Sequence, residues 1–309
     1  CIAVAARLFC GLAVDYPPHP GAWLSALIAT ALSFPVILGY RSLRRVPFPL
    51  KTAILLANLA TTAGALSKIE RSASYLALDR SGAWVLLAPA ALAVAWSVGR
   101  NGDAVGSAAA IWRRVFPLLL VIIVALQLPY YRVGWLRPWL GLGWHAIIDS
   151  GVRAAGWISA ISGLLPLADE TTEEHRLSDF AAVVIGATAA VPLLLLRQMT
   201  TPFMTQRAAG GWLLRLDSLL TNGRAPLYLQ MPMILLWYAG LLHLAACTGF
   251  CAACLLQRML PALDGRLCAL LVALGAALAA NSAGISAVIE GAGQWQFTVL
   301  ALLCAAALF

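Results

Sequence analysis

The sequence predicts an all-α integral membrane protein, because its composition is strongly apolar and its apolar segments are long and numerous. Of its 309 residues, 61% are hydrophobic and only 11% are charged, and the mean hydropathy is +0.85. About a quarter of the residues in soluble domains are charged. About ten apolar segments follow one another with no soluble domain between them. We therefore predict a single transmembrane domain over residues 1–309, in the lipid bilayer of the cell membrane.

The apolar segments are defined by their length and by the residues at their ends. A full span needs about 20 apolar residues, and aromatic side chains such as Trp23 and Tyr40 suit the two membrane interfaces. The predicted segments, in order, are Cys1–Val14, Gly21–Tyr40, Thr52–Leu66, Ala83–Val98, Val115–Leu128, Gly141–Asp169, Phe180–Leu196, Leu227–Leu256, Leu267–Ala280 and Gln296–Phe309. The first and last are short, which we interpret as truncation of the domain at both ends. An amphipathic surface segment is predicted over Thr200–Arg224.

The positive charges indicate membrane topology rather than nucleic-acid binding. The net charge is +8, but the arginines lie mainly between apolar segments, where cytoplasmic loops carry them. The run Arg41–Lys51 is the most basic and is predicted to be cytoplasmic. Arg100 and the pair Arg113–Arg114 place the loop after the fourth segment on the same side. The arginines within 197–224 run against this orientation, since that segment falls outside.

The sixth segment is the most unusual part of the chain. It is apolar, yet Gly151, Gly156 and Gly163 interrupt it. In a bilayer, non-helical backbone is tolerated only where protein or water covers it. Broken spans of this kind form the binding sites of transporters. We therefore predict a broken helix here and a ligand site at the break.

Charged residues near this segment have two interpretations. His145, Asp149 and Arg153 share one helix face at a spacing of four, and ionisable groups within a span are functional candidates. Because they follow an aromatic belt, we favour an interfacial Asp149–Arg153 pair, with His145 as a candidate pH-sensitive group.

Metal and enzyme sites are not favoured by the sequence. The acidic stretch 169–175 (DETTEEH) lacks the helical H-E-x-x-H arrangement and is interpreted as a solvated loop. Cys247, Cys251 and Cys254 share a helix face without a convincing fourth ligand, so we predict that they pack. No nucleophile–base pair, P-loop or dinucleotide fingerprint is present. We predict no metal, no cofactor and no enzymatic activity.

Four stretches resemble the B subunit of the nutrient-germinant receptors of spore-forming bacteria. They are PGAWLSALIATAL, AWVLLAPAALAVAWSVGRNG, WLRPWLGLGWHAIIDSGVRAAGWISAISGLLPL and WYAGLLHLAACTGFCAACLLQRML, and they occur in the order of that family. The resemblance implies the fold of the amino acid/polyamine/cation transporter superfamily. This is a five-plus-five inverted repeat of about ten helices, with helices one and six broken.

The resemblance also implies a function and a site. The protein would bind a germinant, an amino acid or sugar, in the spore inner membrane and signal germination with A-type and C-type receptor subunits. The implied binding residues are Ala3, Ala6, Thr61, Thr62, Gly156, Trp157, Ser159, Ala160, Gly163, His243 and Cys247. The sequence departs from the family at GWISAISG, which lacks the acidic F-G-E-like element, and in the missing first half of helix one.

Two alternatives remain open from the sequence. A secondary amino-acid transporter of the same fold would work without partner subunits. A membrane enzyme using the stretch 169–175 is less favoured, because its acids and histidine are as well explained by a solvated loop.

Overall fold

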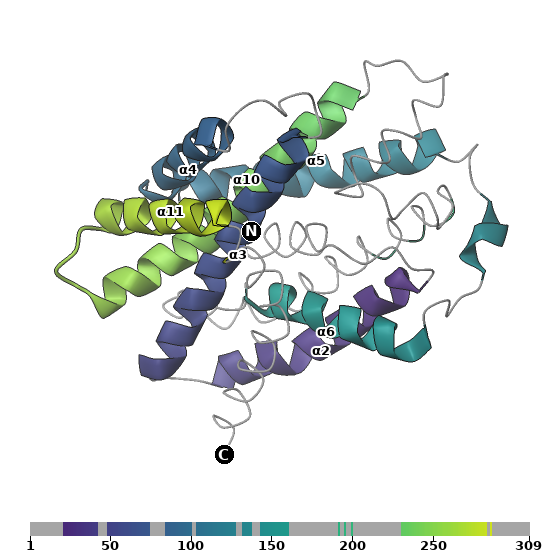
Figure 1. Ribbon diagram of the computed structural model, residues 1–309, viewed down its shortest axis with the longest axis horizontal. Coiled ribbons are helices and arrows are strands. Elements are labelled where there is room, and N and C mark those ends of the chain that lie inside the picture. The colour runs from purple at the N-terminus through teal and green to yellow at the C-terminus, as the bar shows by residue number, and fades with distance from the viewer. Residues whose placement is uncertain are drawn as a thin grey trace.

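The described part of the chain is built from helices alone. The computed structural model describes residues 21–42, 48–74, 84–100, 103–127, 132–137, 143–160 and 230–282, together with positions 191, 195, 199 and 285. Within these ranges the elements are helices and there is no strand (Figure 1), which confirms the all-α prediction. The predicted first, seventh and tenth segments, the surface segment 200–224 and the acidic stretch 169–175 lie outside the described residues.

The helices coincide closely with the predicted segments. They are α2 (Ala22–Ser42), α3 (Phe48–Ser74), α4 (Trp84–Val98), α5 (Asp103–Gln127), the short 3-10 helix η2 (Val133–Leu136), α6 (Gly143–Ala160), α10 (Gln230–Met259) and α11 (Gly265–Asn281). The main difference is α5, which begins well before the predicted Val115. Residues 103–114 are less apolar but rich in alanine, the best helix former. Hydropathy therefore located the span and missed the polar start of the helix.

Local chemistry explains where several helices begin and end. Pro49 and Pro232 lie in the first turns of α3 and α10, where the missing N–H would have no helical partner. The N–H of Gly99 donates to the Ala95 carbonyl oxygen (2.9 Å) at the end of α4. Gly143 begins α6 with a φ of 79°, a backbone conformation that glycine adopts without steric cost.

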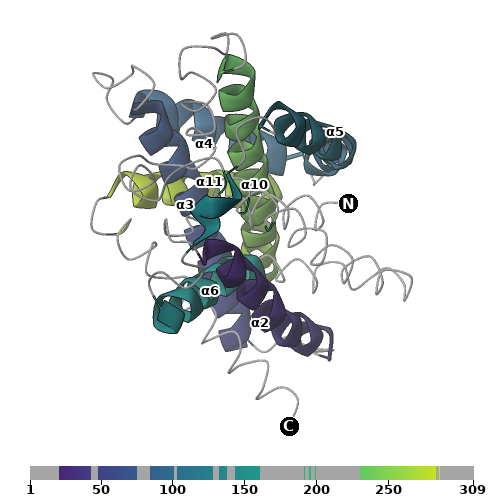
Figure 2. The ribbon, with the colours of Figure 1, turned by 90° about the vertical axis from the view of Figure 1, so that its right-hand side faces the viewer.

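Two groups of helices organise the described structure. Helices α3 and α10 pack against each other and run in opposite directions, as both views show, and α4 and α11 pack against both (Figures 1 and 2). Helices α2 and α6 form a second pair, which contacts the first group through α3 and α6. The buried residues of α10 and α11 are mostly alanine and cysteine. Small residues let helix backbones approach closely, as in membrane bundles.

Helix α11 presents its large apolar residues outward. Its buried residues include Ala269, Ala273 and Ala276, while Leu270, Leu274 and Leu278 are about half exposed. In a water-soluble protein the leucines would face the core. An outward leucine face therefore indicates a surface that meets an apolar surrounding or a partner.

Two described helices are long and apolar enough to cross a membrane. These segments are Lys51–Glu70 of α3 and Tyr238–Met259 of α10. The 22 residues of the second segment are about 33 Å long, against a hydrocarbon core of about 30 Å. Shorter apolar helices are Ala22–Ser33, Trp84–Val98 and Gly265–Asn281. The composition and these two helices agree with a membrane location.

Candidate functional site

The candidate site is a buried polar seam where α3 faces α10. Asn58, Thr61 and Thr62 of α3 are fully buried, as are Thr248 and, nearly so, His243 of α10. The hydroxyls of Thr62 and Thr248 are 2.8 Å apart and join the two helices. Polar groups inside apolar helices are costly and commonly mark function. The seam is therefore the first place to look for a ligand.

The threonines of the seam use most of their hydrogen-bonding capacity locally. Thr61 donates to the Ala57 carbonyl and Thr62 lies 2.8 Å from the Asn58 carbonyl, while Thr248 lies 3.0 Å from the Leu244 carbonyl. A hydroxyl carries one hydrogen and can also accept. One threonine of the Thr62–Thr248 pair therefore donates to its own helix and accepts from the other. The pair is satisfied and stabilises the helix contact.

Asn58 differs from these threonines because its amide oxygen has no hydrogen-bond donor among the described residues. Its Nδ2 donates to the Ile54 carbonyl oxygen (2.8 Å). Its Oδ1 is buried, and no described residue donates a hydrogen bond to it. An unsatisfied buried acceptor costs about 1–3 kcal/mol, and such groups in folded proteins call for an explanation. A ligand with an ammonium or hydroxyl group would supply the missing donor.

His243 and Cys247 lie one turn apart on α10. The Cys247 sulfur is 3.5 Å from His243 Nε2, a contact within α10. Cys247 and Cys251 are free and fully buried in the core, and Cys254 is half-buried, in keeping with a packing role. In the described ranges, no group of three or more His, Cys, Asp or Glu side chains could hold a metal ion.

The end of α6 holds four of the predicted binding residues. Gly156, Trp157, Ser159 and Ala160 belong to a helix that is continuous from Gly143 to Ala160. The prediction of a break is therefore wrong for this part of the segment. A helix accepts a single glycine at a cost of about 1 kcal/mol, which the packing of Ala154 and Ala155 in the core can offset. Gly163, Ala3 and Ala6 lie outside the described residues.

The first part of α6 packs closely on α2. The Ser25 hydroxyl donates to the Ile147 carbonyl oxygen (2.9 Å), and a Cβ placed on Gly151 would lie 2.7 Å from Ile28 Cγ2. Position 25 faces 147 and position 28 faces 151, so the two helices run in the same direction. Gly151 is thus explained by close helix packing rather than by a helix break.

The charged stripe of α6 lies on its outer side. Arg153 and Asp149 form an ion pair of 2.8 Å whose side chains are 53% and 45% exposed, and His145 is exposed. The predicted Asp149–Arg153 pair is confirmed, and its place at a membrane interface stays a prediction. These residues do not share the buried seam.

The structure thus brings together one part of the predicted site. Two contacting helices, α3 and α10, carry Thr61, Thr62, His243 and Cys247. Helix α6 packs on α3 and has no comparable contact with α10 among the described residues. Sequence reasoning missed Asn58 and Thr248. For Asn58 the sequence offered a clue, because it precedes Thr61 and Thr62 by three and four positions and so shares their helix face.

Comparisons with known proteins do not assign the chain to a family. No protein-family model matches it, and no curated protein matches its sequence significantly.

Proposed function

We propose that the protein is a multi-pass membrane protein of the five-plus-five inverted-repeat fold that binds a small polar nutrient. Its role would be that of the B-type subunit of a germinant receptor, to which four stretches of its sequence are similar. The observation that carries the binding proposal is that Asn58 Oδ1, in the seam between α3 and α10, accepts no hydrogen bond from any described residue.

The membrane setting is supported by what the helices bury and expose. α10 contains a segment of membrane-spanning length, and α11 buries alanines while exposing leucines. On α4, Leu92 and Trp96 are 64% and 70% exposed. Exposed apolar faces of this extent are stable where lipid replaces water. They favour a lipid-facing surface along α4 and α11.

The contacts among four helices agree with the inverted-repeat fold. In the predicted order, α3, α4, α10 and α11 are segments three, four, eight and nine. A five-plus-five repeat relates segment three to eight and segment four to nine. This exchange turns the α3–α4 contact into α10–α11 and the α3–α11 contact into α10–α4, and all four contacts are present. Every pair of these four helices is in contact, so the contacts agree with such a repeat without singling it out.

The chemistry of the seam favours a small ligand with hydrogen-bond donors. Its described residues supply an amide oxygen, hydroxyls and an imidazole, but no carboxylate or guanidinium. An amino acid or a sugar can donate to Asn58 Oδ1 through an ammonium or a hydroxyl. Binding that favours one arrangement of the bundle would shift its population, and A-type and C-type subunits would receive that change.

The test is ligand binding by the purified full chain in detergent. We expect at least one amino acid or sugar to raise the midpoint of thermal unfolding, and Asn58→Leu to lower the apparent affinity for it by about tenfold, the effect of one hydrogen bond. The variant should keep or gain stability, because it removes an unsatisfied acceptor. Thr52→Val is the matched control, since the Thr52 hydroxyl donates to the Phe48 carbonyl oxygen of its own helix (3.2 Å), at the exposed start of α3.

Two results would count against the proposal. If no amino acid or sugar shifts the unfolding of the unmodified protein, the nutrient-binding function is wrong. If a ligand binds and Asn58→Leu retains its full affinity, the site lies elsewhere. Uptake of the bound nutrient into proteoliposomes by this chain alone would favour the secondary transporter over the receptor subunit.

A further inference from the structure

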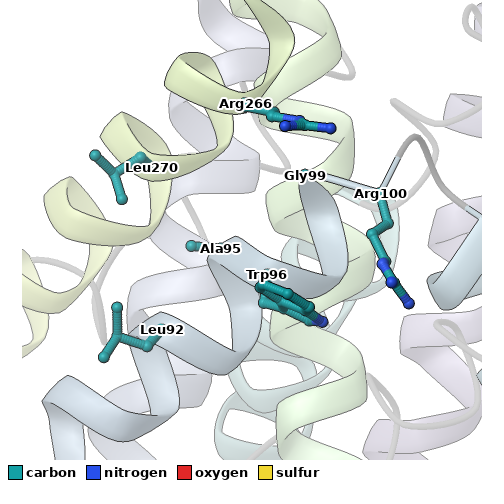
Figure 3. A pocket seen from close by; sticks show the side chains of 7 residues that line it. All are labelled: Leu92, Ala95, Trp96, Gly99, Arg100, Arg266 and Leu270. Carbon is teal, nitrogen blue, oxygen red and sulfur yellow. The ribbon is translucent and has the colours of Figure 1, made fainter.

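A pocket separate from the seam lies between the end of α4 and the start of α11. Its volume is about 400 Å³. The residues that line it are Leu92, Ala95, Trp96, Gly99, Arg100, Arg266 and Leu270 (Figure 3). Sites for small organic ligands occupy about 300–1,000 Å³, so the pocket is large enough for a polar headgroup but not for a whole lipid.

One side of this pocket is cationic. The Arg100 guanidinium carbon lies 5.3 Å from the centre of the Trp96 ring, within the range of cation–π attraction. The stem of Arg266 runs beside Gly99, where an added Cβ would lie 3.9 Å from Arg266 Cγ. Neither arginine forms an ion pair with a carboxylate of the described residues, and this includes the nearby Asp264. The first turn of α11 adds the positive end of a helix dipole.

The other side of the pocket is apolar and continues outward. In Figure 3 the nitrogen-bearing ends of Arg100 and Arg266 lie on one side, and Leu92 and Leu270 lie on the other. Leu274 and Leu278 extend the exposed apolar face along α11. The pocket thus has a cationic end that opens onto a surface suited to hydrocarbon.

We propose that this pocket binds an anionic phospholipid, with its phosphate between Arg100 and Arg266 and an acyl chain along the leucines of α4 and α11. The proposal rests on the membrane setting of the proposed function, and not on nutrient binding. Basic pockets between transmembrane helices on the cytoplasmic side bind anionic headgroups. The predicted topology places the ends that follow the fourth and eighth segments on the cytoplasmic side. A free phosphate would leave the apolar side of the pocket unused.

The experiment compares lipids added to the purified full chain in a neutral detergent. We expect phosphatidylglycerol to raise the unfolding midpoint, while phosphatidylcholine and inorganic phosphate do not. Arg100→Gln and Arg266→Gln should each weaken the apparent affinity for phosphatidylglycerol by about fivefold, and the double variant should lose the shift. Both side chains are exposed, so the variants fold. Arg137→Gln, at an exposed arginine outside the pocket, should behave as the unmodified protein does.

Each outcome decides the proposal. It is overturned if phosphatidylglycerol raises the unfolding midpoint of the Arg100→Gln/Arg266→Gln double variant as much as that of the unmodified protein. It is also overturned if Arg137→Gln reduces this rise as much as the double variant does. It is also overturned if inorganic phosphate protects as well as the lipid, because the site then binds free phosphate. If a nutrient raises the unfolding midpoint but phosphatidylglycerol does not, the proposed function stands and the lipid site is wrong. If phosphatidylglycerol raises the midpoint but no nutrient does, the lipid site stands and the nutrient-binding function is wrong.

Discussion

The α2–α6 and α3–α10 pairs are each joined by a buried hydroxyl, but they differ in the polar groups that remain. In the first, the Ser25 hydroxyl donates to a backbone carbonyl of α6, and Gly151 lets the backbones approach. In the second, two threonine side chains meet, and the neighbouring Asn58 Oδ1 has no described donor. The first contact is complete by itself. The second retains hydrogen-bonding capacity, which is what a binding site requires.

The largest loss of stability is expected from adding a methyl group where α2 and α6 pack most closely. The Cβ of Gly151→Ala would lie 2.7 Å from Ile28 Cγ2 and 3.2 Å from the Ser25 carbonyl oxygen, so the helices must separate. Overpacking of this kind costs about 1–3 kcal/mol, which reversible unfolding in detergent would measure. Ile28→Ala should restore part of this loss.

Gly275→Ala on α11 is the matched control for this prediction. Its added Cβ would meet only Leu59 Cδ1, at 4.0 Å. The substitution should be neutral or stabilise by up to about 1 kcal/mol, because alanine favours helices. If Gly151→Ala proves as stable as Gly275→Ala, the two helices do not approach as described.

A smaller loss of stability is expected when the hydroxyl pair that joins α3 and α10 is removed. Thr62→Val and Thr248→Val, singly and together, form a double-mutant cycle. Because the hydroxyls are 2.8 Å apart, we expect a coupling of about 0.6 kcal/mol, the average for hydrogen bonds between membrane helices. Thr30→Val is the control, because Thr30 bonds the Ala26 carbonyl of its own helix. Strictly additive losses for Thr62 and Thr248 would mean that the two hydroxyls do not pair.

The bounds of the helices could be predicted from the sequence, but the contacts between the helices could not. The helix bounds followed from the length of apolar segments, and α2, α4 and α11 agree with prediction within a few residues. Gly151 was predicted to weaken its helix, yet it serves a contact with Ile28. The sequence shows that a glycine is present but not whether a neighbouring helix uses its missing side chain.

The candidate site was only partly predictable for a related reason. Thr61 and Thr62 were selected, but Asn58 was not, because an asparagine in an apolar helix has the same sequence context whether its amide is paired or unpaired. Its unpaired oxygen depends on what packs opposite it. Arg100 and Arg266 line one pocket although they are remote in sequence, and only the packing of α4 on α11 brings them together.

The smallest effect is expected at the charged stripe of α6, and it sharpens the comparison by separating exposed charge from buried polarity. Asp149→Asn removes an i,i+4 ion pair whose side chains are about half exposed. Solvent screens such pairs, so the loss in unfolding free energy should be about 0.2–0.5 kcal/mol. It should disappear in about 1 M salt, where the Debye length is about 3 Å. Arg153→Gln should cost the same, and the double variant no more. A loss above about 1 kcal/mol would mean that the pair is not screened as its exposure implies, and weaker nutrient binding would instead make this stripe part of the ligand site.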